Sequence, residues 1–286
     1  MPFETFATEA RSILSATTGF IAEAGFTHSL TPARNCTFGC SYCYVPTMRI
    51  YGGLKQQDWA HWGAFTTYKS NAPELLRCEL RRHSSNDQVI YCSPLVDPYQ
   101  PAEETEQSMP PILDELIARP PKVFVIQTRG PLIVRDIPKL KDLSQRTTLR
   151  VSFSVTTNRE PVRRLYEPHC ATIDCRLKAI RELRHAGIAV FATLAPILPC
   201  DPEQLAAMAL DATDQDVIGD SLHIRAVKPR GATTREAAFA ISARHGFSEW
   251  LAPEFQSDVI VRIGSVVRGA GRRFAAGTEG FGWLAQ

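Results

Sequence analysis

The sequence lacks several features that mark common classes of protein. No apolar run approaches the roughly 18 residues that a membrane-spanning helix requires. The first residues, Met-Pro-Phe-Glu-Thr-Phe, include neither the basic start nor the apolar core of a signal peptide. We therefore expect no membrane partner and a cytoplasmic location, where thiols stay reduced.

Net charge is also nearly absent. The 286 residues carry 32 Lys+Arg and 30 Asp+Glu, a formal charge of +2, whereas a nucleic-acid footprint is normally a strong local excess of Lys and Arg. The small basic excess lies in residues 221–286, which hold nine basic and five acidic side chains. A solvated surface accounts for such a bias, so the charge only weakly favours a polyanionic substrate.

Cysteine, by contrast, is concentrated in one short segment. Three of the eight cysteines are Cys36, Cys40 and Cys43, spaced C-x3-C-x2-C, so that one loop can present three thiolates from different directions. Gly39 permits the tight backbone that such a loop needs. Thiolates hold iron–sulfur clusters, and three ligands on a cubane cluster leave one iron open. An open iron suits a cluster that binds and activates a small chelating molecule.

Two other kinds of site could use some of the same cysteines, and a disulfide framework is a third interpretation. A structural zinc site needs four ligands, and the next cysteine, Cys78, lies far downstream. A thioredoxin-like pair of Cys40 and Cys43 would leave Cys36 without a role. Both alternatives stay open, whereas a disulfide framework belongs to short secreted chains and is set aside.

Segments with strand character alternate with segments of helical periodicity. We expect strands at residues 26–30, 88–92, 122–128, 149–155, 188–194 and 221–226. We expect helices at residues 71–82, 110–117, 140–143, 177–183, 201–208, 233–245 and 253–267. Such alternation implies a parallel sheet with right-handed crossovers.

A parallel sheet of this kind can be a doubly wound open sheet or a barrel. Polar residues just past the predicted strand ends favour the barrel. No glycine-rich dinucleotide fingerprint follows the first strand, and barrel active sites are built just past the strand ends. We therefore predict an α/β fold, a partial (β/α)6 barrel of the TIM type.

The two ends of the chain are expected to lie outside this core. Residues 1–25 are predicted to be an N-terminal lead-in of helical character, residues 26–232 the barrel, and residues 233–286 C-terminal helices with a glycine- and arginine-rich tail. We expect the tail to be a closing flap or a mobile segment. Residues 48–70 are aromatic without a firm period, and we expect them to pack over the barrel edge.

The cysteine spacing, with Tyr42 in the aromatic position before Cys43, resembles the radical SAM superfamily. In that family the loop holds a [4Fe-4S] cluster whose open iron binds the amino and carboxylate groups of S-adenosylmethionine. The resemblance implies a (β/α)6 core and reductive cleavage of S-adenosylmethionine to methionine and a 5′-deoxyadenosyl radical. It also implies an external electron donor of the flavodoxin or ferredoxin type.

Further segments, in the same order along the chain, resemble the spore photoproduct lyase-like branch. The founding activity of that branch is the direct reversal of a thymine dimer lesion in spore DNA, which makes DNA a candidate substrate. The chain departs from the branch at Ala33 and Asn35, where a tyrosine and a glycine are usual. The matching segments are residues 29–36, 96–103, 128–129, 151–157, 166–168, 176–177 and 195–197.

The resemblance implies cofactor-binding roles for Tyr42, Ser93, Arg129 and Ser154. Ser93 falls where the family contacts the amino group of S-adenosylmethionine, and Ser154 falls near the ribose or the amino-acid portion. Arg129 replaces the usual lysine at the end of the third strand, and it would bind the carboxylate as a planar fork rather than as a point charge. Ordinary capping of strand ends is the alternative for both serines.

Cys92, directly before Ser93, is the candidate catalytic residue. Family members that repair DNA use a cysteine close to this position to return a hydrogen atom to the product radical. That role requires the side chain to face the barrel interior, and a small buried hydrophobic residue is the alternative.

The leading hypothesis is a radical SAM enzyme acting on a nucleic acid or another bulky substrate. The first alternative is radical modification of a protein, a peptide or a small molecule. The second alternative is an iron–sulfur protein without catalysis, such as a redox sensor.

Overall fold

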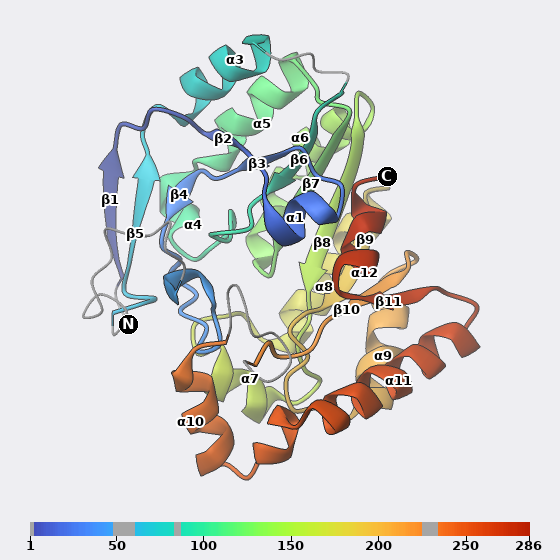
Figure 1. Cartoon of the computed structure of the whole chain (residues 1–286). Coiled ribbons are helices and arrows are strands. Elements are labelled where there is room, and N and C mark those ends of the chain that lie inside the picture. Colours follow the sequence, from blue (N-terminus) through green and yellow to red (C-terminus); the bar gives the residue numbers. More distant parts are fainter. Residues whose placement is uncertain (1–2, 48–60, 83–86, 225–233) are drawn as a thin grey trace.

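The computed structural model describes residues 3–47, 61–82, 87–224 and 234–286. Within them, an eight-stranded sheet runs through the middle of the molecule (Figure 1). Every neighbouring pair of its strands is parallel except β2 and β3. In spatial order the strands are β11 (Phe274–Ala276), β10 (Val217–Gly219), β9 (Ala189–Leu194), β8 (Thr148–Ser154), β7 (Val123–Thr128), β6 (Val89–Cys92), β3 (His28–Leu30) and β2 (Leu14–Ala16).

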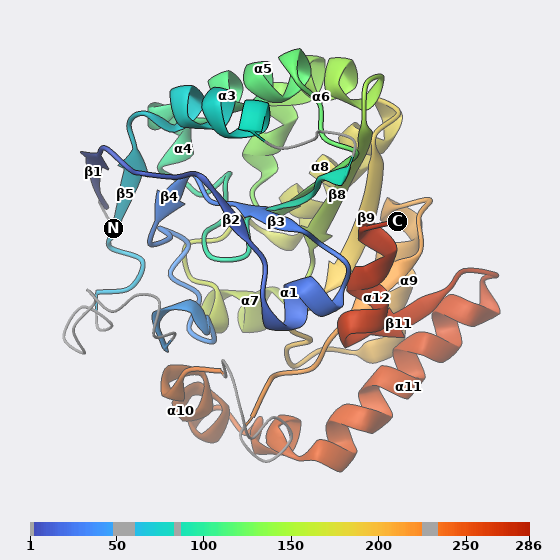
Figure 2. The same ribbon diagram turned by 45° about the horizontal axis from the view of Figure 1, so that its top comes forward.

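Helices connect successive parallel strands and cover the outer face of the sheet (Figure 2). These helices are α3 (Ala72–Arg82), α5 (Met109–Ala118), α6 (Ile137–Ser144), α8 (Ile173–His185) and α9 (Pro202–Ala212). Two short helices, α4 (Glu103–Glu106) and α7 (Glu160–Tyr166), follow the carboxyl ends of β6 and β8. None of the described helices is long and apolar enough to cross a membrane.

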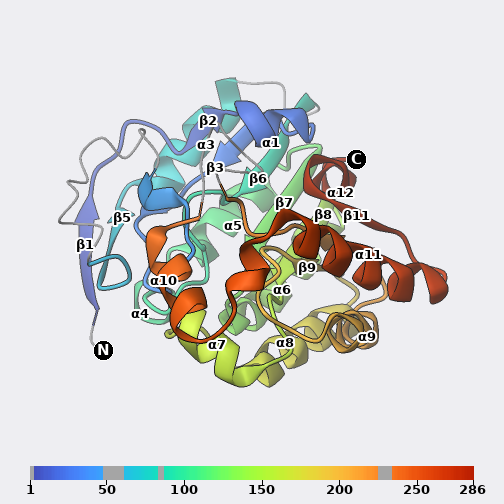
Figure 3. The same cartoon turned by 60° about the horizontal axis from the view of Figure 1, so that its bottom comes forward.

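At the carboxyl ends of the strands, α10 (Glu236–Arg244) lies beside α7, and α11 (Pro253–Gly269) runs from there along α9 (Figure 3). The 3₁₀ turn η5 (Ser248–Leu251) connects them and contacts both. This end of the barrel is therefore lined by segments from the last part of the chain.

The strands are apolar on both faces, because the sheet is covered on both faces. Successive residues of a strand point to opposite sides. Ile90 and Ile126 accordingly pack with the outer helices in the main core, whereas Tyr91 and Val125 belong to a separate cluster on the inner face.

The inner cluster is completed by the two ends of the chain. Helices α1 (Gly19–Glu23) and α12 (Gly277–Leu284) contact each other, and Phe281 of α12 packs edge-to-face on Phe20 with ring centroids 5.3 Å apart. Apolar side chains thus fill this part of the barrel, which is a packed core rather than a pore.

The predicted partial barrel is confirmed. Strands β3, β6, β7, β8, β9 and β10 form its six parallel strands, and β11 adds a seventh. The helices expected from residues 71–82 to 253–267 are present, with ends that differ by a few residues. The division of the chain at residues 25 and 232 stays a prediction, and the second of these boundaries lies outside the described residues.

The expected sixth strand at residues 221–226 is wrong. The strand is β10, and residues 221–224 are irregular, while residues 225 and 226 lie outside the described part of the chain. Val217-Ile218-Gly219 is too short a run to be recognised locally. It becomes a strand because β9 pairs with one edge and β11 with the other.

The helical lead-in is also wrong, since residues 4–25 contain two strands before α1. Strand β1 (Glu4–Thr8) pairs in parallel with β5 (Phe65–Lys69), and β5 pairs with β4 (Ala33–Arg34) in a separate three-stranded sheet. Strand β5 lies in the segment expected to lack a period, of which residues 48–60 are outside the described part. Pairing partners about 60 residues away override the local pattern here.

The glycine- and arginine-rich tail is neither a mobile segment nor a flap in this structure. Its residues form β11, which extends the sheet, and α12, which packs on the inner face. Gly280 makes this packing possible, because a Cβ atom there would lie 2.6 Å from the carbonyl oxygen of Ala275. The tail is therefore packed against the sheet in this structure.

Candidate functional site

The cysteine loop lies between β4 and the 3₁₀ turn η1 (Val45–Thr47), past the carboxyl end of β3. Cys36 and Cys40 are buried, Cys43 is half-buried, and all three are free thiols. Asn35 has a φ of 63°, a left-handed conformation that asparagine tolerates better than most residues. This explains how asparagine can stand where a glycine was expected from the resemblance.

Gly39 and Gly63 bring two backbone segments into contact at this loop. Both have positive φ, and a Cβ atom on Gly63 would lie 2.6 Å from the Cα atom of Gly39. The curl of the cysteine loop is therefore supported by the chain just before β5.

The donor set of the loop fits an iron–sulfur cluster. In the described residues, no group of three or more His, Cys, Asp or Glu side chains is arranged to hold a metal ion. Three thiols on one loop match the ligands that clusters use. Asn35 Oδ1, Ser41 Oγ and Trp62 Nε1 are buried on or beside the loop without hydrogen-bond partners. Buried polar groups are normally paired, so these atoms are consistent with a polar group bound at the loop.

Glu167 is the centre of a buried group of charges beside the loop. Its Oε1 accepts hydrogen bonds from Arg129 Nη1 at 2.6 Å, from Thr156 Oγ1 at 2.9 Å and from the Tyr42 hydroxyl. Its Oε2 accepts a hydrogen bond from Arg176. Burial alone would raise the pKa of Glu167, but Arg176 and Arg129 outweigh it and lower the pKa to about 2. Glu167 is therefore ionised.

Cys40 is the loop cysteine that contacts this group. Its Sγ lies 3.6 Å from Nη1 of Arg129 and 3.8 Å from Sγ of Cys170. The hydrogen bond with Cys170 lowers the pKa of Cys40 against the effect of burial, and Arg129 adds to this. Burial instead raises the pKa of Cys36, and it raises that of Cys43 to about 12. Of the three thiols, Cys40 is the one whose surroundings favour the thiolate.

Arg129 is held at the end of β7 by the loop that follows β6. Asp97 accepts hydrogen bonds from the Thr128 hydroxyl at 2.6 Å and from the backbone N–H of Arg129 at 2.8 Å. The backbone of Arg129 is thus fixed by the half-buried carboxylate of Asp97, and its guanidinium is fixed by the buried carboxylate of Glu167.

The structure brings two of the four predicted cofactor-binding residues together, Tyr42 and Arg129. Ser154, at the end of β8, accepts a hydrogen bond from Gln127 Nε2 at 2.7 Å. Ser93 is buried after β6, and its Oγ has no hydrogen-bond partner. Neither serine is hydrogen-bonded to the Glu167 group, and the roles of all four residues stay predictions.

Cys92 does not face the barrel interior. It is fully buried in the main core with Ile90 and Ile126, whereas the preceding residue, Tyr91, belongs to the inner cluster. Strand alternation therefore directs the Cys92 thiol toward the outer helices, and burial raises its pKa. The orientation on which a hydrogen-donor role depended is absent, and the packing alternative describes the thiol in this structure.

Sequence reasoning did not assign roles to Glu167, Arg176 or Cys170. Glu167 and Arg176 did lie within the segments that matched the lyase-like branch, at residues 166–168 and 176–177. A signal for these two was therefore present without a function attached to it. Cys170 carried no such signal, because its contact depends on how the connection between α7 and α8 folds against the cysteine loop.

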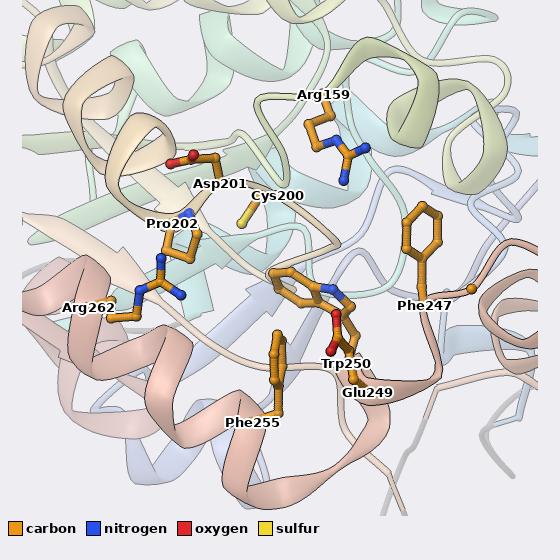
Figure 4. Close-up of a pocket in the computed structure, with 10 residues that line it drawn as sticks. Arg159, Cys200, Asp201, Pro202, Phe247, Glu249, Trp250, Phe255 and Arg262 are labelled. Carbon is orange, nitrogen blue, oxygen red and sulfur yellow. The ribbon is translucent and has the colours of Figure 1, made fainter.

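A cavity of about 460 Å³ opens at the same end of the barrel (Figure 4). Loops after β8 and β9 form one side of it, and η5 and α11 form the other. Trp250 and Phe255 are in edge-to-face contact with ring centroids 5.1 Å apart, and the Arg159 guanidinium lies over the ring of Phe247 at 5.8 Å. The lining residues are Arg159, Cys200, Asp201, Pro202, Gly246, Phe247, Glu249, Trp250, Phe255 and Arg262.

The chain belongs to the radical SAM superfamily, whose family model matches residues 30–211. An uncharacterized protein of Mycobacterium tuberculosis is 29% identical over 174 residues, which cover 61% of this chain and 50% of the relative. An uncharacterized protein of Acidianus two-tailed virus is 26% identical over 212 residues, covering 69% of this chain and 67% of the relative. The chain thus spans about half the length of the mycobacterial relatives that it matches.

Solved structures of spore photoproduct lyase share the fold. One mutant structure has a TM-score of 0.58 at 17% identity, over 85% of this chain and 66% of that chain. A complex of the lyase with a dinucleoside spore photoproduct has a TM-score of 0.56 at the same identity and coverage. Identity at this level establishes the shared barrel and leaves the substrate of this chain to be argued from its own residues.

Proposed function

We propose that this protein is a radical SAM enzyme whose cluster is held by Cys36, Cys40 and Cys43. A bound [4Fe-4S] cluster would supply the electron that cleaves S-adenosylmethionine to methionine and a 5′-deoxyadenosyl radical. The observation that carries the proposal is the three-cysteine loop placed against buried charges at the carboxyl ends of the barrel strands. Active sites of such barrels are built at this end.

The balance of charge beside the loop supports a site for a carboxylate. Glu167 is a single anion shared by two cations, Arg129 and Arg176. The second positive charge has no carboxylate of its own and faces the Cys40 sulfur, 3.6 Å from Arg129 Nη1, in a buried setting where an unpaired charge is costly. A carboxylate of the bound cofactor would compensate it, and Arg129 is the more accessible of the two, with 15% of its side chain exposed against 1% for Arg176.

The two serines and Tyr42 have hydrogen-bonding capacity suited to the same cofactor. Ser93 Oγ can accept a hydrogen bond from an amino group, since no protein group occupies it. Ser154 accepts from Gln127, so its own hydroxyl proton can be donated to a ribose oxygen. Tyr42 is held by Glu167, which fixes the orientation of its ring beside Cys40.

The test of this function is the production of 5′-deoxyadenosine. Anaerobically reconstituted protein, given S-adenosylmethionine and either dithionite or a reduced flavodoxin or ferredoxin, should release it with multiple turnovers. The matched control is Cys40→Ala, which should release none. If the cluster-loaded protein binds S-adenosylmethionine without cleaving it, the function fails and the non-catalytic iron–sulfur alternative takes its place.

We further propose that the substrate carries a planar ring, with a lesion-containing DNA strand as the leading candidate. The cavity at this end offers aromatic surfaces in Trp250 and Phe255 and a cation in Arg159, and bases stack on aromatic side chains by about 1–3 kcal/mol each. Incubation with a spore photoproduct dinucleotide should restore two thymines. If the protein instead alters a peptide or a small molecule and leaves the lesion unchanged, the DNA proposal is wrong while the radical chemistry stands.

A further inference from the structure

Cys170 lies outside the cysteine loop but touches it. Its Sγ is 3.8 Å from that of Cys40, although the two residues are 130 positions apart in the sequence. Both side chains are buried, with 6% of each residue exposed. The pair therefore exists only because the connection between α7 and α8 is folded over the loop.

The position of Cys170 is fixed by several buried contacts. The guanidinium of Arg163 donates to the carbonyl oxygen of Cys170 at 2.8 Å and to that of Glu167 at 3.0 Å. The backbone N–H of Ser41 donates to the carbonyl oxygen of Tyr166 at 2.8 Å, which ties the cysteine loop to the end of α7, directly before the connection. These contacts fix the backbone of Cys170 and so hold its thiol against Cys40.

We propose that Cys170 is a positioning residue that donates its S–H group to the Cys40 thiolate when Cys40 holds the cluster. The inference rests on the proposed function, since it gives Cys170 a role toward the cluster that the loop would bind. A thiol is a weak donor, but a hydrogen bond inside a protein is strengthened by the low local dielectric constant. The Arg129 guanidinium, 3.6 Å from the same sulfur, reinforces the effect.

The consequence is a shift in the ease of reducing the cluster. Hydrogen bonds to ligand sulfurs are one of the factors that set cluster potentials. A donor to a thiolate offsets part of its negative charge, and the reduced cluster carries one more negative charge than the oxidised cluster. Cys170 should therefore favour the reduced state, which is the state that delivers the electron.

The experiment compares wild type with Cys170→Ala and Cys170→Ser in the full chain, reconstituted anaerobically without S-adenosylmethionine. The exposed thiol of the neighbouring helix α8 supplies a matched control, Cys175→Ala. Iron per chain and the ratio of reduced to oxidised cluster at a series of fixed potentials are measured, the latter by electron paramagnetic resonance.

All four proteins should bind the same amount of iron. At the wild-type midpoint, Cys170→Ala should show a ratio of reduced to oxidised cluster about threefold to tenfold lower, the range expected for one hydrogen bond. Cys170→Ser keeps a hydroxyl donor and should fall between alanine and wild type, while Cys175→Ala should match wild type. Equal midpoint potentials for Cys170→Ala and wild type would mean that Cys170 contributes only to packing. Loss of iron from Cys170→Ala would make it a ligand rather than a donor, and either result overturns the proposal.

A second measurement tests the contact without any cluster and covers the case of variants that fold poorly. In the cluster-free wild-type chain, diamide takes two electrons and two protons from a pair of neighbouring thiols and leaves a disulfide. Peptide mass mapping should find Cys40 joined to Cys170 in preference to Cys36 or Cys43. Absence of that pair would remove the basis of the inference. A wild-type chain that forms the pair but binds no iron would instead contradict the proposed function.

Discussion

Near the amino ends of its strands the barrel interior is apolar, whereas near the carboxyl ends it is polar and charged. Val89 and Val123 begin their strands in the inner cluster, which also holds Phe281 of α12. Farther along, Gln127 and Ser154 are hydrogen-bonded to each other at 2.7 Å. Beyond the strand ends, the buried charges around Glu167 adjoin the cysteine loop.

The difference separates a region that holds the barrel together from a region that pays a stability penalty for its chemistry. Burying an apolar ring stabilises the fold without further conditions. Burying ionised groups is favourable only when each has its partner, and removal of one partner is costly. The effects of substitutions on stability should therefore differ between the two ends of the barrel, both in their physical cause and in their size.

The largest expected effect is at the cysteine loop. Each of Cys36→Ala, Cys40→Ala and Cys43→Ala should reduce bound iron from about four per chain, the load of one cubane cluster, to near zero. Colorimetric iron analysis and the visible absorption spectrum measure the loss. The exposed thiols offer a matched control, since Cys78→Ala and Cys175→Ala should keep the full load. Full iron in any of the three loop variants would contradict the cluster assignment.

Glu167→Gln should be the most destabilising change among the charged residues. It keeps the size of the side chain but leaves Arg129 and Arg176 buried without their shared anion. The free energy of unfolding should fall by about 3–5 kcal/mol, measured by urea denaturation of the cluster-free chain. Glu104→Gln, on the exposed surface of α4, is the control and should be close to neutral. A loss below about 1 kcal/mol would mean that the two arginines are satisfied by other groups.

Phe281→Ala tests the apolar end of the barrel and should cost about 3 kcal/mol of unfolding free energy, as expected for a buried aromatic ring. The side chain is largely buried and packs on Phe20. Iron content should be unchanged, because Phe281 belongs to the inner hydrophobic cluster, whereas Cys36 and Cys40 belong to a separate hydrophobic cluster. Loss of the cluster in this variant would show that the two ends of the barrel are coupled.

The pH dependence of stability should separate the two regions again. Glu167 has its pKa lowered from 4.5 to about 2 in the folded chain. Its ionisation therefore adds stability that is present above about pH 4.5 and is lost as the pH falls toward 2. Across that window wild type should lose up to about 3 kcal/mol more than Glu167→Gln, whereas Phe281→Ala should follow the wild-type slope. Parallel curves for wild type and Glu167→Gln would contradict the assignment of an ionised Glu167.

The smallest effect expected is at Arg129. Arg129→Ala should weaken binding of S-adenosylmethionine about tenfold or more, as a lost charge-assisted hydrogen bond would, and should leave the iron content intact. Arg129→Lys restores the lysine expected from the resemblance and should lose less. Calorimetric titration of the cluster-loaded protein measures both. Unchanged affinity in the alanine variant would restrict Arg129 to its contacts with Glu167 and Cys40.

The parallel core of the fold could be predicted because its signals are local. Segments such as 122–128 are short, apolar and rich in β-branched residues, and the segments between them show a helical period. Strand β7 and helix α8 therefore lie where the sequence predicts them. The cysteine loop was equally visible, because its three cysteines lie within eight residues. Both patterns depend only on residues that are close together in the sequence.

The two ends of the chain could not be predicted for the opposite reason. Strand β1 exists through its pairing with β5, and β11 exists through its pairing with β10. A three-residue strand such as β11 has little β character of its own. The glycine-rich sequence around it predicts a flexible segment, because the close packing that requires Gly280 is not visible in the sequence.

The sequence by itself determined the class of fold and the loop that defines the family, because periodicity and cysteine spacing are properties of neighbouring residues. Only the tertiary structure decided which side chains stand around that loop. Glu167 and Cys170 come from the connection between α7 and α8, and Arg176 comes from the first turns of α8. All three lie more than 120 residues from Cys40, and Cys170 is 130 positions away. It likewise decided that Cys92 faces the outer helices rather than the interior. The physical reason is that buried charges and thiols take their pKa values from groups that are near in space. The tertiary packing of segments distant in the sequence decides which groups those are.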